Sequence, residues 1–137
     1  MSLRRLAAAV LPVALAAAPV AAQDWQKVAE LPGGIAVEMD RQTLFEGLDG
    51  NRMVLMATFR KQLANTTMET AAAVDCARKQ AKIRGVRLLS DGEILSEKVM
   101  ATAEFAPINP GSAEATYYTA LCGEEIALPP PGEEGGE

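Results

Sequence analysis

The sequence lacks histidine altogether and holds only two cysteines among its 137 residues. Without histidine, no Ser-His-Asp or Cys-His nucleophilic site can form, and zinc, copper and iron sites lose their usual imidazole ligand. The two cysteines, Cys76 and Cys122, lie 46 positions apart, so the chain has no CxxC redox motif. We therefore predict no cofactor, no metal site and no histidine-dependent catalysis.

Aromatic residues are also scarce, with one Trp, two Tyr and three Phe. The core must be built mainly from Val, Leu, Ile, Met and Ala. Four methionines are predicted to fill it rather than to bind a metal: Met39, Met53, Met56 and Met68. A two-carboxylate hydrolase is left open, because such pairs are assembled in space. However, no pair of acids has a spacing that indicates acid–base catalysis, and the few aromatics disfavour a sugar-binding platform.

The first 22 residues have the composition of a secretory signal peptide. Arg4 and Arg5 form a short basic region, residues 6–18 form an uncharged apolar run, and Val20 and Ala22 occupy the positions that a signal peptidase reads. A retained membrane anchor is the alternative, but the run is shorter than the roughly 20 apolar residues that span a bilayer. We expect cleavage after Ala22 and export to the periplasm or the medium, with no membrane span.

Acidic residues are concentrated at the C-terminus. Residues 124–137 contain five acids and no base, and their proline and glycine content predicts a disordered tail. Residues 23–123 have the length of one domain and are nearly neutral, with 13 acids and 11 bases. Because the chain lacks the basic balance typical of nucleic-acid binding, nucleic acid is not expected as a partner.

Apolar alternation and turn residues predict short strands in the first half of the domain. Residues 40–51 contain two glycines and are interpreted as a connection between strands. The expected strands are residues 24–30, residues 35–39, a central and most apolar strand at 52–61, and an edge strand at 94–105.

A C-terminal helix is predicted after Pro107 and Pro110, two prolines that exclude regular structure around them. Ser112 is a suitable N-cap, and Gly123 is typical of a helix end. Between them, four residues fall on one helical face: Ala115, Tyr118, Leu121 and Cys122.

The stretch Thr66–Leu89 has two interpretations. Local rules favour a helix, because a capping-box pair opens the stretch and alanines dominate it. The alternative is a pair of strands, residues 68–76 and 79–89, with Gly85 at a bulge that redirects the second strand. Propensity by itself favours the helix.

The two cysteines are predicted to pair with each other. In an exported chain with only two cysteines, an intramolecular disulfide is the ordinary outcome. In the chain-entropy description, closing a loop of this length stabilises the fold by roughly 4 kcal/mol. The disulfide between Cys76 and Cys122 would join the apolar face of the C-terminal helix to the sheet.

The densest cluster of charge is basic. It places five bases and no acid within ten residues: Arg78, Lys79, Lys82, Arg84 and Arg87. One hypothesis is a patch that binds an anionic partner, such as lipopolysaccharide, a sulfated glycan or an acidic protein. The other is the solvated face of one element, which is the commoner role of a run of charges.

The order of the motifs provides a further indication. Trp25 opens the domain, the motif Val74-Asp75-Cys76-Ala77 precedes the basic run, and Pro107-Ile108-Asn109-Pro110-Gly111-Ser112 precedes the helix that ends in Cys122. This layout resembles the surface-adhesin protein E family of bacterial exported proteins. The resemblance covers residues 24–123, which is nearly the whole predicted domain.

The resemblance implies an α+β fold, in which one C-terminal helix packs on an antiparallel sheet of about six strands and a disulfide joins strand to helix. It therefore favours strands on both sides of Cys76, against local helix propensity. It also implies adhesion to host proteins. The adhesive member of the family carries a lipid anchor, whereas no cysteine lies at the predicted cleavage site of this chain.

The sequence thus predicts an exported, non-enzymatic binding module whose partner is an unidentified protein or envelope component. The alternative is a soluble periplasmic accessory or stress-response domain without an adhesive role. Cys76 and Cys122 are expected to be structural, and the five bases are the candidate partner-binding residues. No catalytic, cofactor-binding or metal-binding residue is predicted.

Overall fold

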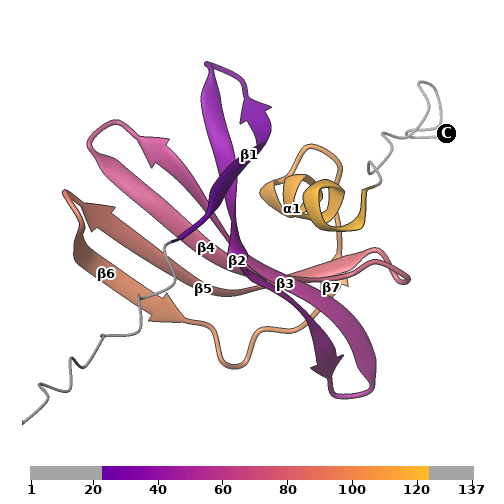
Figure 1. Cartoon of the computed structure of the whole chain (residues 1–137). Helices are drawn as coiled ribbons and strands as arrows, with labels where there is room; N and C mark the ends of the chain where they lie inside the picture. Colours follow the sequence, from indigo (N-terminus) through magenta and orange to yellow (C-terminus); the bar gives the residue numbers. More distant parts are fainter. Residues whose placement is uncertain (1–22, 124–137) are drawn as a thin grey trace, which may run out of the picture.

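The fold is seen in a computed structural model, which describes residues 23–123. The predicted signal peptide, residues 1–22, and the predicted acidic tail, residues 124–137, lie outside the described residues. Within the described part, an antiparallel sheet carries one helix on one of its faces (Figure 1).

The six long strands of the sheet follow one another in the order of the chain. They are β1 (Trp25–Leu31), β2 (Ile35–Asp49), β3 (Arg52–Leu63), β4 (Thr66–Asp75), β5 (Gln80–Ser90) and β6 (Glu93–Val99). A two-residue strand, β7 (Ala106–Pro107), pairs with β5, and the chain ends its described part in α1 (Ala113–Cys122). These elements confirm the predicted α+β fold.

The stretch Thr66–Leu89 is two strands and a turn, so the helix favoured by local propensity is wrong. The reason is tertiary: β4 lies between β3 and β5, and side chains on both of its faces are buried. A strand buried on both faces can be rich in alanine, because tertiary packing then outweighs the helix propensity of that residue. The extra residue of the β4–β5 ladder is Arg84, one position before the glycine expected at the bulge.

β2 is longer than the sequence indicates. Residues 40–49, interpreted as a connection, continue the strand, although the ladder to β3 is irregular between Asp40 and Phe45. The buried carboxylate of Asp40 organises this irregularity by accepting backbone hydrogen bonds from Asp24 (3.1 Å) and Gln42 (3.0 Å). Side-chain bonding of this kind replaces ladder bonds that a bulge removes.

Two other predictions need correction. The edge strand β6 ends at Val99 rather than at residue 105. The segment around Pro107 is partly regular, because Ala106 and Pro107 pair with β5 at the edge that β6 leaves uncovered. A proline is tolerated there, since a strand at an edge need not donate from every residue.

The core lies between α1 and the sheet. The ring of Tyr117 stacks on Phe59 with centroids 4.3 Å apart, and the cluster around this pair includes the buried side chains of Val37, Met39 and Ala72. Met39 fills the core as predicted, but Met53 is 55% exposed, so the prediction is wrong for Met53.

The helix begins and ends where the sequence predicts. The side-chain oxygen of Ser112 accepts a hydrogen bond from the backbone of Ala115 at 3.2 Å, which is an N-cap. Gly123 adopts a left-handed conformation with φ 73°, and its N–H donates to the carbonyl of Thr119 at 3.0 Å. Tyr118 from the predicted helical face is fully buried beside Val74.

The predicted disulfide is present. Cys76, which directly follows β4, is bonded to Cys122, the last residue of α1, with 5.7 Å between their Cα atoms. The hydroxyl of Tyr118 also donates to the carbonyl of Cys76 at 3.3 Å. The C-terminal end of the helix is therefore held to the end of a central strand.

We predict that the double variant Cys76→Ser/Cys122→Ser loses roughly 4 kcal/mol of unfolding free energy, because the unfolded chain regains the entropy of an open loop. Urea denaturation followed by circular dichroism measures this loss. Wild-type protein treated with reductant should show the same shift, whereas the double variant should not respond to reductant. A loss below about 1 kcal/mol would contradict the proposed contribution of the disulfide.

We also predict an alkaline loss of stability through Tyr117. Burial raises the pKa of its hydroxyl above the usual value of 10.0; a hydrogen bond with Thr70 opposes this rise, and the charge of Glu114 adds to it. The folded state keeps the Tyr117 proton up to a higher pH than the unfolded chain does. The stabilisation that comes from this protonated hydroxyl is therefore present below pH 10.0 and is lost as the pH rises through the folded pKa. Two measurements on wild type and Tyr117→Phe test this prediction: absorbance at a tyrosinate wavelength and the denaturation midpoint, each followed as the pH rises. An equal alkaline fall of the denaturation midpoint in both proteins would contradict the role of Tyr117.

Candidate functional site

The sheet face opposite α1, here called the open face, carries a row of charges that crosses all six long strands. Residues that alternate with the core positions Phe59 and Ala72 point to this face. Each member of the row is the ladder partner of the next: Lys27, Glu38, Arg60, Glu69, Arg87 and Glu97. The charges alternate in sign along the row, and opposite charges on neighbouring strands stabilise a sheet.

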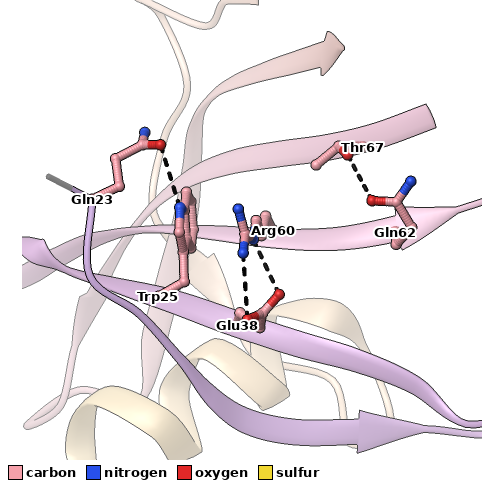
Figure 2. A network of polar contacts seen from close by, with 6 residues as sticks. All are labelled: Gln23, Trp25, Glu38, Arg60, Gln62 and Thr67. Atoms are coloured by element: carbon pink, nitrogen blue, oxygen red, sulfur yellow. Dashed lines mark hydrogen bonds and ion pairs between the residues drawn. The ribbon is translucent and has the colours of Figure 1, made fainter. Parts of the chain in front are cut away.

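Two ion pairs in this row have well-defined geometry. Arg87 donates to Glu69 Oε1 from Nη2 (2.6 Å) and from Nε (3.1 Å), and the Glu69 side chain is only 8% exposed. Arg60 donates from Nε to Glu38 at 3.0 Å, and its guanidinium lies 4.2 Å from the centre of the Trp25 ring (Figure 2). Near the β1 end of the row, the Trp25 ring therefore makes a cation–π contact with Arg60, which is also paired with Glu38.

The neighbouring row of the open face consists mainly of small side chains. Thr58, Ala71 and Gly85 are consecutive ladder partners on β3, β4 and β5, and Val99 follows on β6. Because these residues leave space between the larger ones around them, a hollow of about 320 Å³ opens above them, which we call the first hollow. Its lining also includes Glu69, Arg84, Val86, Arg87, Glu97 and Lys98.

A second hollow of about 410 Å³ lies beside the first, between the β2–β3 hairpin and the segment that follows β6. It is lined by Leu48, Asp49, Met56, Lys82, Arg84, Val99, Met100 and Ala101. Arg84 and Val99 line both hollows. We call the two hollows together the groove. The volume of each hollow falls in the range of small-molecule sites.

The structure divides the predicted basic cluster into two parts. Arg78 and Lys79 lie exposed in the turn between β4 and β5, where the backbone N–H of Arg78 donates to Asp75 at 3.0 Å. Lys82, Arg84 and Arg87 line the groove. The structure therefore brings three of the five bases together on one face, and the anion-binding role of the cluster stays a prediction.

The three bases in the groove have different partners. Lys82 forms an ion pair with Asp49 at 2.5 Å, and its ammonium lies 4.8 Å from the centre of the Phe105 ring. Arg87 is paired with Glu69, as described above. Within residues 23–123, Arg84 forms no ion pair; its Nη1 contacts the Met56 sulfur at 2.8 Å.

Asp49 is held in its ionised form. The hydrogen bond from Lys82 is the main cause that lowers the pKa of this carboxyl below its usual value of 3.8. Burial is the next-largest effect and opposes it, and the charges of Lys82, Arg84 and Arg52 add to the lowering. The charge of Lys82 is therefore balanced at neutral pH. The importance of Asp49 was not predicted, because it lies 33 positions before its partner and in a segment interpreted as a connection.

Neither a cluster of metal ligands nor a membrane-spanning helix is found in the described residues. Within residues 23–123, no group of three or more Cys, Asp and Glu side chains is arranged to hold a metal ion. The same part of the chain contains no helix long and apolar enough to cross a bilayer.

Comparison of the chain with protein-family models, with curated proteins and with solved structures found no match. The resemblance to the surface-adhesin protein E family therefore stays a prediction based on the sequence motifs.

We predict that Glu69→Gln lowers the free energy of unfolding by about 1.5–3 kcal/mol, because it removes the charged acceptor of two hydrogen bonds from a largely buried position. The matched variant Glu38→Gln, in which both partners are about one-third exposed, should cost less than about 1 kcal/mol. Urea denaturation of both variants measures the difference. Equal costs would contradict the role of burial in the Glu69–Arg87 pair.

Proposed function

We propose that this chain is an exported, non-enzymatic binding module that holds its partner on the open face of the sheet. The observation that carries this proposal is the groove, which brings the guanidinium of Arg84 next to apolar side chains on the face that α1 leaves uncovered. Concave surfaces with a few polar groups among apolar ones are typical of binding sites.

Exposed apolar residues in the groove lining support this proposal. They are Leu48 on β2, which is 69% exposed, and Val99 on β6, which is 72% exposed. Clusters of exposed apolar residues commonly mark interaction surfaces. The arrangement suits contact with a partner that has both apolar and charged groups.

The disulfide supports the export that the signal-like N-terminus predicts. Disulfides form and persist mainly in oxidising compartments, such as the periplasm and the extracellular medium. The disulfide between Cys76 and Cys122 is compatible with that location. The resemblance to the adhesin E family further supports a matrix protein or an envelope component as the partner.

The proposal is tested by binding assays with chain that begins at Gln23, against purified matrix proteins and envelope fractions. Val99→Asp introduces a charge into the groove at a side chain that is 72% exposed, so the fold should be unaffected. Ile94→Asp makes the same kind of change on the same strand, outside the groove lining. We expect saturable binding by wild type and Ile94→Asp, and at least about tenfold weaker binding by Val99→Asp, since one buried charge commonly costs more than this factor.

Absence of any saturable partner would count against the proposed function. Equal binding by Val99→Asp would show that the partner contacts another surface.

The second candidate is a periplasmic accessory domain without an adhesive role. It is favoured by the lack of a cysteine at the predicted cleavage site, since the lipid anchor of the adhesive family member would be attached there. Cell fractionation with surface proteolysis separates the two candidates. Protection of the chain in intact cells favours the accessory role, whereas cleavage in intact cells favours adhesion.

A further inference from the structure

Arg84 occupies a special position in the groove. It is the residue without a ladder partner between the pairs Ala71–Gly85 and Ala72–Ile83, and it lines both hollows. Its side chain is exposed, and its Nη1 contacts the sulfur of Met56 at 2.8 Å. A thioether is a weak acceptor and carries no charge, so it does not balance the guanidinium.

Among residues 23–123, the neighbouring charges leave the Arg84 charge in excess. Lys82 is balanced by Asp49 at 2.5 Å, and Arg87 is balanced by Glu69 at 2.6 Å. The second hollow is lined by one acid, Asp49, and two bases, so its lining carries one net positive charge. A ligand with a single negative charge would neutralise it.

The other five residues that line the second hollow have apolar side chains. Leu48, on β2, and Val99, at the end of β6, both line this hollow and are strongly exposed. Met56 lies next to the Arg84 guanidinium, and Met100 and Ala101 complete the apolar lining. Methionine side chains adapt readily to flexible apolar ligands.

From this juxtaposition we propose that the second hollow binds a small amphiphile with one carboxylate head and an apolar body, of the chemical class of a medium-chain fatty acid. The carboxylate accepts hydrogen bonds from the planar guanidinium of Arg84, which matches carboxylate geometry. The apolar body lies against Met56, Leu48 and Val99. This inference rests on the proposed function, because it names the ligand of the same groove.

The charge of the hollow favours a carboxylate over a phosphate. A phosphate group with two negative charges would leave excess negative charge near Asp49, which is itself ionised. A neutral amphiphile would bury apolar surface but leave the guanidinium without a counter-charge. The single net positive charge therefore selects a monoanion.

The probe is decanoate, titrated below its micelle concentration into isotope-labelled protein beginning at Gln23 and followed by amide NMR shifts. We expect saturable shifts at residues 48–49, 56, 84 and 99–101. Arg84→Gln should weaken binding at least about tenfold, because a hydrogen-bonded charge pair is lost. Arg78→Gln removes the same charge from the β4–β5 turn, outside the groove lining, and should leave the affinity unchanged.

Decan-1-ol, which has the same apolar body without the charge, should bind wild-type protein at least about tenfold more weakly than decanoate. This comparison uses only wild-type protein, so it tests the inference even if Arg84→Gln does not fold. Arg84→Lys should give intermediate affinity, because it keeps the charge but loses the planar donors.

Equal affinity for decanoate and decan-1-ol, unchanged affinity in Arg84→Gln, or shifts that map away from the second hollow would each overturn the inference. Saturable capture of a macromolecular partner that depends on Val99, without decanoate binding, would overturn this inference and leave the proposed function intact. Decanoate binding without any macromolecular partner would support the inference and count against the adhesive role.

Discussion

The structure depends on the burial of β4 on both of its faces. On one face, Ala72 and Val74 pack against the aromatic side chains of α1. On the open face, Ala71 is small enough to leave the first hollow above it, while Glu69 is almost completely buried and paired with Arg87. Small side chains thus allow close approach of the helix on one side and form a concave surface on the other.

The helix and the groove occupy opposite faces of the sheet, so the core contacts of α1 and the exposed residues of the groove involve different side chains. The Cys76–Cys122 disulfide and the Tyr118 hydroxyl hold the end of α1 to the turn after β4. The lining of the groove comes instead from strands β2 to β6 and from the segment that follows β6. Substitutions of exposed groove residues such as Val99 can therefore alter the proposed binding surface without removing core contacts.

Local rules predicted the features that depend on neighbours in the sequence. The N-cap at Ser112 and the left-handed Gly123 were predictable, because caps satisfy backbone groups within one helical turn. The same rules failed for Thr66–Leu89, where non-local pairing decides the conformation. They also failed for residues 40–49, because a buried carboxylate, Asp40, stabilises an irregular strand that glycine content had indicated as a connection.

The sequence by itself determined the cysteine pairing, the helix boundaries and the exclusion of histidine chemistry, because each follows from residue type or from short spacing. It also identified the basic cluster. Only the tertiary structure decided which of those bases share a face and which have a partner. Lys82 forms an ion pair with Asp49, and Arg87 forms one with Glu69, because strand register brings residues that are distant in sequence together. The same register places Arg84 next to Met56.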